Sequence, residues 1–189
     1  MITTPDGATS QSGRSAPLGG PADLAMMLAW RSRSDLVLVG AGTAREEGYG
    51  IPNQPGLRIA VVTRSCNLDP TMPLFASGRG FLVTTRDAPQ SPIETLRCGT
   101  GKVDLREAIL ELGRVRAGAV IHVEGGPSLN ASLLADDLVD AVNLTFSRRL
   151  AGPHAGDPIA TGFSPSRRFS IADVATQDGF VFVRYERVR

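Results

Sequence analysis

The sequence has few cysteines and histidines, which could form a metal site or a disulfide framework, and it has no cluster of basic residues. Its two cysteines, Cys66 and Cys98, form no Cys-x-x-Cys pair and show no metal-ligand spacing. We therefore expect two free thiols and no metal, although a single disulfide is the alternative. Lysine occurs once, at Lys102, and 20 basic residues balance 19 acidic ones without a block of like charge. This balance gives no support to nucleic-acid binding.

Long hydrophobic runs are also absent. No apolar run reaches the length of a membrane-spanning helix, and no signal peptide is visible, so we expect a cytoplasmic protein. A chain of 189 residues with 42% hydrophobic residues can form a single domain over residues 1–189 with its own core. The 21 glycines and 13 prolines are spread along the chain, which favours many turns over disorder.

Short apolar runs alternate with segments of helical pattern. The run at residues 35–39 is typical of a strand buried on both faces of a parallel sheet. Further strands are expected at residues 57–62, 80–85, 120–123 and 138–146, the last part of a strand at residues 1–4, and a short edge strand at residues 93–97. Helices are expected at residues 21–33, 104–116 and 127–134, the second with Asp104 and Glu107 as a capping box. Residues 169–175 and 180–187 flank Gln177-Asp178-Gly179, a strong hairpin signal. The fold class predicted is α/β, a mostly parallel central sheet flanked by helices with an antiparallel C-terminal hairpin.

One stretch, Glu124-Gly125-Gly126-Pro127-Ser128-Leu129, combines the end of a strand with the start of a helix. Glycines there let a ligand touch the backbone, and the free N–H groups of a first helical turn point at an anion. Proline suits the first helical position because its missing N–H costs nothing there. An ordinary strand-to-helix turn is the alternative interpretation.

Two further strand ends suggest the same ligand. Gly40-Ala41-Gly42-Thr43 follows one apolar run, and Thr63-Arg64-Ser65 follows the next. Ligands of open α/β sheets bind at the carboxyl ends of strands, and glycine turns that open helices suit a pyrophosphate. Arginine beside two hydroxyls suits an additional phosphate. The combination indicates NADPH rather than NADH, although the sequence has neither a Gly-x-Gly-x-x-Gly fingerprint nor a P-loop.

These segments resemble the pyrimidine reductase domain of riboflavin biosynthesis. The resemblance rests on Asp6-Gly7, Gly13-Arg14-Ser15, residues 35–43, Asp69-Pro70 and residues 124–129, and it covers nearly the whole chain. It implies a dihydrofolate-reductase-like fold and an NADPH-dependent reduction. The reaction implied converts the ribosylamino group of a 5-amino-6-(5-phosphoribosylamino)uracil-type pyrimidine to a ribitylamino group. It also suggests a homodimer, for which the C-terminal hairpin leaves an edge.

The resemblance assigns roles to residues that match the family's motifs. The residues implied to bind the cofactor are Gly40, Gly42, Thr43, Thr63, Arg64, Ser65, Gly125, Gly126, Ser128 and Leu129. Arg14 and Ser15 match the loop that meets the substrate phosphate, while Asp6 and Glu124 match acidic residues near the substrate. A carboxylate there can stabilise an iminium cation or relay a proton, so Asp6 and Glu124 are the catalytic candidates.

Each assignment has a simpler alternative. Asp6 in Pro-Asp-Gly fits a plain turn, Arg14 fits a mobile loop, and Glu124 fits a pair with an arginine. Tyr49 fits either the substrate pocket or the packing of its loop. His122, inside a strand, fits a buried neutral histidine, and His154 fits an exposed loop.

The sequence leaves alternatives to this function. One is a reductase with the same fold and another substrate, either a pterin or folate or an unrelated small molecule, and the other is a non-catalytic NADP-binding module. The chain starts at or inside its first strand, so we expect an upstream piece to be missing or the start to be misassigned. The zinc deaminase signature, His-x-Glu with Pro-Cys-x-x-Cys, is not present, and we therefore expect a reductase only.

Overall fold

The structure is a computed structural model of the chain and describes residues 1–114, 118–152 and 156–189. It contains two compact units. One combines both ends of the chain, Met1–Ala29 with Gly126–Arg189, and the other is the continuous segment Trp30–Gly125. His154 lies outside the described residues. Within the described residues, no helix has the length and apolar character needed to cross a bilayer.

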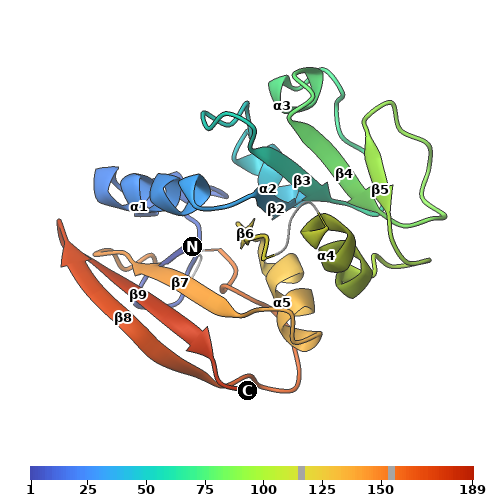
Figure 1. Cartoon of the computed structure of the whole chain (residues 1–189). Coiled ribbons are helices and arrows are strands. Elements are labelled where there is room, and N and C mark those ends of the chain that lie inside the picture. Colours follow the sequence, from blue (N-terminus) through green and yellow to red (C-terminus); the bar gives the residue numbers. More distant parts are fainter. Residues whose placement is uncertain (115–117, 153–155) are drawn as a thin grey trace. The chain divides into compact units, whose positions relative to one another are not determined.

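The continuous unit contains a five-stranded sheet in which all neighbouring strands are parallel (Figure 1). Its order is β5-β4-β3-β2-β6. The strands are β2 Leu36–Gly40, β3 Arg58–Val62, β4 Gly80–Thr84, β5 Thr95–Arg97 and β6 Ile121–Val123. Every strand expected in this region is present. The parallel sheet predicted from the near-continuous apolar runs is therefore confirmed.

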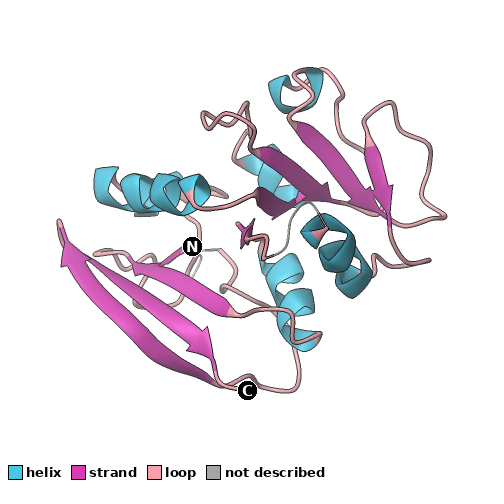
Figure 2. Ribbon diagram, viewed as in Figure 1, coloured by secondary structure: helices cyan, strands magenta, loops and turns pink. Residues whose placement is uncertain are grey.

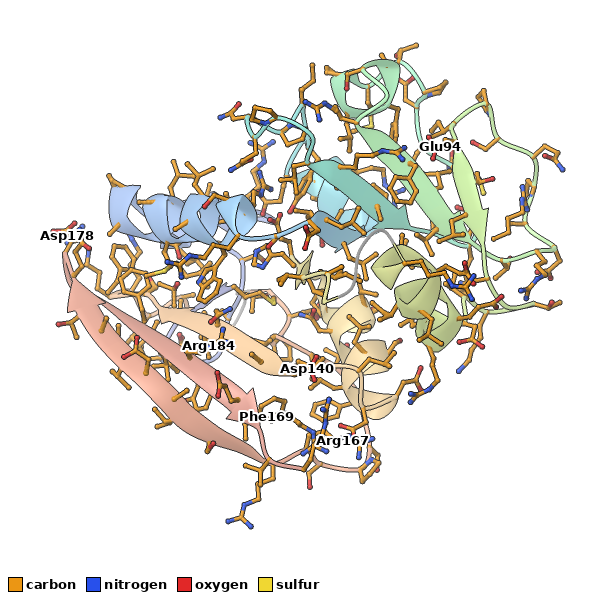
Figure 3. All side chains as sticks on the ribbon, viewed as in Figure 1. Glu94, Asp140, Arg167, Phe169, Asp178 and Arg184 are labelled. Carbon is orange, nitrogen blue, oxygen red and sulfur yellow. The ribbon has the colours of Figure 1, made fainter. Side chains whose placement is uncertain are left out.

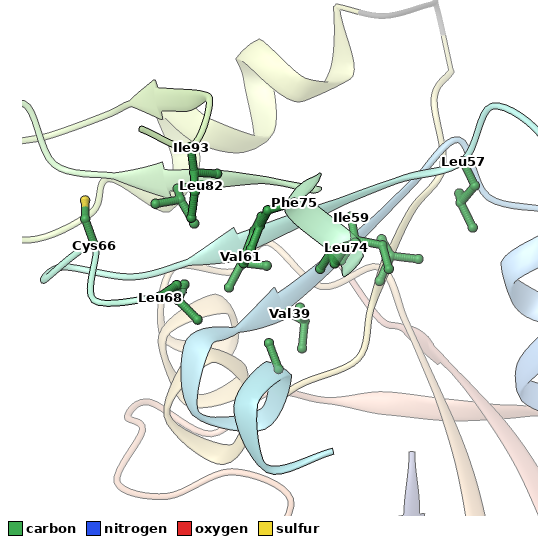
Figure 4. Close-up of a cluster of buried hydrophobic side chains, with 12 residues drawn as sticks. Val39, Leu57, Ile59, Val61, Cys66, Leu68, Leu74, Phe75, Leu82 and Ile93 are labelled. Carbon is green, nitrogen blue, oxygen red and sulfur yellow. The ribbon is translucent and has the colours of Figure 1, made fainter. Parts of the chain in front are cut away.

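One face of this sheet carries the larger described core. Val39 from β2, Val61 from β3 and Leu82 from β4 are fully buried and belong to one cluster (Figure 4). Leu74 and Phe75 join it from the short helix α3 Pro73–Ala76. Cys66 belongs to the same cluster, and both it and Cys98 are free buried thiols as expected.

The remaining helices of this unit are α2 Ala41–Glu46 and α4 Leu105–Gly113. The Asp104 side chain caps α4 by accepting from the Glu107 N–H at 2.9 Å. The prediction of a full capping box is wrong, because the Glu107 side chain does not accept from the Asp104 N–H. The Asp104 N–H donates to the carbonyl of Cys98, and the Glu107 carboxylate is drawn instead to Arg86 and to the Gly99 N–H.

The other unit contains a four-stranded sheet of order β1-β7-β9-β8. Its strands are β1 Ile2–Thr3, β7 Ala141–Phe146, β8 Phe169–Gln177 and β9 Phe180–Arg187. β1 pairs with β7 in parallel. The longer strands β7, β9 and β8 pair antiparallel (Figure 2). The predicted hairpin is present, with Asp178 and Gly179 both at positive φ, as a two-residue type I′ turn requires. It thus belongs to a mixed sheet that it shares with β1 and β7.

Helices complete this unit. The helix α5 Pro127–Ala135 and the 3₁₀ turn η1 Ala16–Leu18 lie within it, whereas α1 Pro21–Ser32 starts in this unit and ends in the other. Arg167, labelled in Figure 3, donates to the carbonyls of Leu134 and Ala135. It satisfies carbonyls that the end of α5 leaves without helical partners.

Candidate active site

The carboxyl ends of β3, β2 and β6 meet at one edge of the parallel sheet. Gly40 is in register with Val62, and Leu38 is in register with Val123. The Gly40 N–H donates to the Gly125 carbonyl oxygen at 2.6 Å. The structure thus brings together Gly40, the Thr63-Arg64-Ser65 stretch and Gly125, as the sequence predicts for an open α/β sheet.

The first glycine turn is tighter than expected. The helix α2 begins at Ala41, directly after Gly40, so Gly42 and Thr43 lie in its first turn rather than in a loop before it. A side chain built at Gly42 would meet no atom within 4 Å. The backbone there is therefore exposed, and contact of Gly42 with a ligand stays a prediction.

The end of β3 presents a cation to solvent. Thr63 is buried, with its N–H bonded to the Val83 carbonyl at 3.0 Å, while Arg64 and Ser65 are exposed. In the described part of the chain, no hydrogen bond or ion pair holds the Arg64 guanidinium. An uncommitted arginine at a strand end suits recognition of a phosphate.

The second glycine turn leads from the end of β6 into α5. Gly125 has φ +89°, a left-handed conformation that favours glycine, and Gly126 is the N-cap of α5. Pro127 occupies the first helical position as predicted, followed by exposed Ser128 and buried Leu129. The N–H groups of a first helical turn have no acceptor within the helix, so this turn offers donors to an anion.

Glu124 lies in a polar cluster formed with Arg31, Tyr49 and His122. Arg31 makes two hydrogen bonds to the carboxylate, Nε to Oε1 and Nη2 to Oε2, each at 2.6 Å. The Tyr49 hydroxyl donates to Oε2 at 2.5 Å, and His122 Nε2 lies 3.5 Å from Oε1. The Arg31 guanidinium also stacks over the Tyr49 ring, 5.6 Å from its centroid. The interpretation of Glu124 as the partner of an arginine is thus confirmed.

Burial and charge set the protonation states of this cluster. Burial raises the pKa of Glu124, but the hydrogen bonds and charge of Arg31 and the Tyr49 hydroxyl outweigh it and leave that pKa below its ordinary value. Burial and the neighbouring carboxylate raise the pKa of Tyr49 well above 10.0, so the phenol stays protonated. Burial lowers the pKa of His122 despite the attraction of Glu124. His122 is thus neutral at pH 7, as expected for a strand histidine.

Asp6 follows β1 in the other unit. Its carboxylate accepts from the N–H of Gly152 at 2.9 Å and from the N–H of Ala151 at 3.2 Å. A hydrogen bond from the Thr4 side chain and these two backbone bonds lower its pKa to about 2. Arg14 and Ser15 lie in the same unit, Arg14 in a tight turn bonded to the backbone of Gln11.

The sequence did not identify Arg31 and Tyr49 as partners of Glu124. They precede it by 93 and 75 residues, and their helix and loop give no sequence signal of a shared contact. An isolated arginine on a helix face and a tyrosine between glycines are common surface features. The pairing becomes visible only once the sheet order places β6 beside β2.

A comparison with protein-family models identifies the family of the chain. The sequence model of the RibD C-terminal domain matches residues 1–178. No curated protein sequence gives a significant match. A dihydrofolate reductase from Enterococcus faecalis has a TM-score of 0.59 at 13% identity over 100% of this chain and 94% of its own, which identifies the general fold.

Three solved structures with higher TM-scores show the same fold. A pyrimidine reductase-like protein from Corynebacterium diphtheriae is 22% identical with a TM-score of 0.85, over 100% of this chain and 90% of its own. RibD from Acinetobacter baumannii is 18% identical with a TM-score of 0.82, and this chain spans 57% of its length. The riboflavin biosynthesis reductase Rib7 of Saccharomyces cerevisiae is 19% identical with a TM-score of 0.74, over 99% of this chain and 87% of its own. With a family match over residues 1–178, the chain belongs to the RibD C-terminal domain family, and its fold is similar to that of dihydrofolate reductase.

Proposed function

We propose that this protein is an NADPH-dependent reductase that acts on a 5-amino-6-(5-phosphoribosylamino)uracil-type pyrimidine. The product is the corresponding ribitylamino compound. Membership of the RibD C-terminal domain family over residues 1–178 is the observation that carries the proposal. The name of the yeast relative, a riboflavin biosynthesis reductase, supports the same reaction.

The cofactor proposal rests on the edge of the parallel sheet. In the continuous unit, the exposed Gly42 and the Arg64 guanidinium, which has no partner among the described residues, suit a phosphorylated dinucleotide. In the other unit, the N–H groups of the first turn of α5 suit a phosphate. Gly40, Gly42 and Thr43 would hold it at α2, and Gly125, Gly126, Ser128 and Leu129 at α5. Thr63, Arg64 and Ser65 would hold the ribose and its additional phosphate. When bound, NADPH supplies the hydride, while the protein binds and orients the two reactants.

The substrate proposal rests on the unit that contains both chain ends. Arg14 and Ser15 would hold the substrate phosphate through a guanidinium and a hydroxyl. Asp6 would lie beside the sugar carbon that accepts the hydride, where its negative charge stabilises the iminium form of the substrate. Because the pKa of Asp6 is about 2, its carboxylate is ionised at neutral pH and acts through its charge rather than as an acid.

We propose for Glu124 a role other than the substrate contact that the resemblance implies. Its side chain is 7% exposed and both of its oxygens are already hydrogen-bonded. A substrate contact would have to displace Arg31 or Tyr49 from a buried carboxylate, which is costly. We therefore assign direct stabilisation of the substrate to Asp6 and a positioning role to Glu124.

We further propose a homodimer formed through β8. This strand is the edge of its sheet, and eight of its nine residues are exposed, among them Ile171 and Val174. A long edge with unpaired backbone groups and apolar side chains is suited to pairing with a second copy. The partner then covers the two exposed apolar side chains.

Binding and turnover test this proposal separately. Titration with NADPH and NADH, followed by calorimetry or by the fluorescence of Trp30, the single tryptophan, tests the cofactor. Binding of neither nucleotide would exclude every reductase interpretation. The Arg14→Ala variant tests the substrate, because loss of a phosphate contact should raise the KM for the phosphoribosyl pyrimidine about tenfold or more. An unchanged KM would remove the support for a phosphorylated substrate.

A further inference from the structure

Three parts of the continuous unit supply the cluster around Glu124. Arg31 comes from the last turn of α1, Tyr49 from the segment after α2, and Glu124 from the end of β6. The Arg31 side chain is 15% exposed, and Glu124 is more deeply buried. A charge pair at this depth is retained only when its geometry and its remaining hydrogen bonds are good, which the bidentate contact and the tyrosine hydroxyl provide.

The backbone next to the cluster is equally constrained. The Glu124 N–H donates to the Leu38 carbonyl at 2.9 Å, and the Gly125 carbonyl accepts from Gly40 at 2.6 Å. Glu124 is therefore held by its backbone from β2 and by its side chain from α1 and the loop after α2. The residue that follows it, Gly125, adopts its left-handed conformation directly beyond this fixed point.

Tyr49 gives the cluster a second link between the two glycine turns. The helix α2 starts at the first turn, after Gly40, and Tyr49 follows the end of this helix with its N–H bonded to the Ala44 carbonyl at 3.0 Å. Its hydroxyl then reaches Glu124, the residue before the second turn. The two turns are thus joined by the backbone bond from Gly40 to Gly125 and by the side-chain bond from Tyr49 to Glu124.

We infer that Arg31 and Tyr49 are positioning residues that act through Glu124 to fix the Gly125 turn in the conformation that binds the cofactor. This inference rests on the proposed function for the identity of the ligand. A mobile turn would have to be ordered on binding, at the expense of affinity, whereas a prefixed turn avoids that cost. The cluster then governs the affinity for the dinucleotide and leaves the chemical step to other residues.

The test compares Glu124→Gln, Tyr49→Phe and Arg31→Met with the wild type. Each protein is titrated with NADPH well below its unfolding temperature and assayed at saturating NADPH. We expect the Kd for NADPH to rise about ten- to hundredfold in Glu124→Gln and Arg31→Met, and less in Tyr49→Phe, which loses one hydrogen bond. The kcat should stay within about threefold of the wild type. The conservative variant Arg31→Lys, which keeps the charge, should recover part of the affinity.

Matched substitutions elsewhere serve as controls. Glu94→Gln breaks the exposed ion pair with Arg58, and Tyr185→Phe removes the hydroxyl of the other tyrosine, on β9. Both should leave the Kd for NADPH unchanged. A wild-type Kd in the three cluster variants, with only their thermal stability lowered, would overturn the positioning role. A large fall in kcat at unchanged Kd would overturn it in favour of direct contact with the substrate. Failure of the wild type to bind NADPH would instead overturn the proposed function, and this inference with it.

Discussion

The Gly40 N–H donates to the Gly125 carbonyl oxygen at 2.6 Å, so the ends of two strands that lie 85 residues apart in the sequence are joined by one backbone hydrogen bond. Both glycines belong to turns that the sequence assigns to the cofactor. The parallel pairing of β2 with β6 creates this contact, because it aligns the carboxyl ends of the two strands. Gly40 and Gly125 therefore lie at one edge of the parallel sheet, which is the edge that we propose for the pyrophosphate of the cofactor.

Removal of the Arg64 guanidinium should weaken the preference for NADPH over NADH. The exposed side chain lies at the end of β3 and is free to fork onto a phosphate that NADH lacks. In Arg64→Ala we expect the Kd for NADPH to rise while the Kd for NADH stays the same. The ratio of the Kd for NADH to the Kd for NADPH should therefore fall about ten- to hundredfold. Titrations with both nucleotides measure this ratio. Lys102→Ala, which removes an exposed cation elsewhere, should leave it unchanged, and tighter binding of NADH by the wild type would contradict the assignment.

Asp6 should contribute to stability in a defined range of pH. Its folded pKa of about 2 lies below the ordinary value of 3.8, so folding favours the charged form. The contribution is complete above pH 3.8 and is lost as the pH falls through the folded value toward 2. The difference in unfolding midpoint between the wild type and Asp6→Asn should therefore shrink across this interval. A difference that stays constant from neutral pH to pH 2 would show that the carboxylate is not held as described.

The catalytic role of Asp6 is tested by kinetics of the same variant. Asp6→Asn keeps the size of the side chain and one acceptor oxygen but removes the negative charge. We expect kcat to fall about a hundredfold or more while the Kd for NADPH stays near that of the wild type, since the charge acts on the substrate cation. Protonation of Asp6 should not lower the kcat of the wild type at any pH above about 3, because the pKa of Asp6 is about 2. An unchanged kcat in Asp6→Asn would show that Asp6 has no catalytic role and only forms part of a turn.

Gly80 and Gly113 are two sites at which an added methyl group should change the free energy of unfolding in opposite directions. A side chain at Gly80, the first residue of β4, would come within 2.5 Å of Leu74 Cγ and 2.9 Å of Phe75 Cδ1, whereas one at Gly113, in the last turn of α4, would meet nothing within 4 Å. Gly80→Ala should lower the free energy of unfolding by about 1–3 kcal/mol through overpacking. Gly113→Ala should raise it by about 0.5–1 kcal/mol through helix propensity. Denaturant titrations compare them, and equal effects would contradict the packing of α3 on β4.

The proposed homodimer is tested on β8. Val174 is 52% exposed on this edge strand, and Val174→Lys should convert a dimer to a monomer because a charged edge resists pairing. Leu110→Lys on α4, where the leucine is 63% exposed, is the control and should leave the mass unchanged. Light scattering after size exclusion measures the mass. A wild type that is monomeric at every concentration, or a dimer that Val174→Lys leaves intact, would exclude the β8 interface.

The sequence predicts the elements well where a local pattern suffices. Buried strands such as β2 and β3 appear as near-continuous apolar runs, and Asp178-Gly179 marks the hairpin through its need for positive φ. What it misses depends on distant partners. Glu107 matches a capping box locally, but Arg86 and the Gly99 N–H compete for its carboxylate. The resemblance matches Glu124 to an acidic residue near the substrate, whereas in the structure Arg31 and Tyr49 donate hydrogen bonds to its carboxylate.

The hairpin illustrates the same limit at the level of the sheet. Its two strands and its turn follow from residues 169–187, but its sheet partners do not. β9 pairs with β7 along six residues, and β7 in turn pairs with β1 at the other end of the chain. Register with strands this far away in the sequence is decided by packing and not by any local pattern. The prediction of an antiparallel C-terminal hairpin is therefore right, and the composition of its sheet is a finding of the structure.

The rate at which the wild-type protein oxidises NADPH with each candidate substrate tests the central claim most directly. The assay follows the absorbance of the reduced nicotinamide with 5-amino-6-(5-phosphoribosylamino)uracil or with dihydrofolate, and the product is identified by mass spectrometry. We predict turnover with the phosphoribosylamino pyrimidine, formation of its ribitylamino product, and little or no turnover with dihydrofolate. Oxidation of NADPH by dihydrofolate alone, or binding of NADPH without reduction of the pyrimidine, would contradict the account.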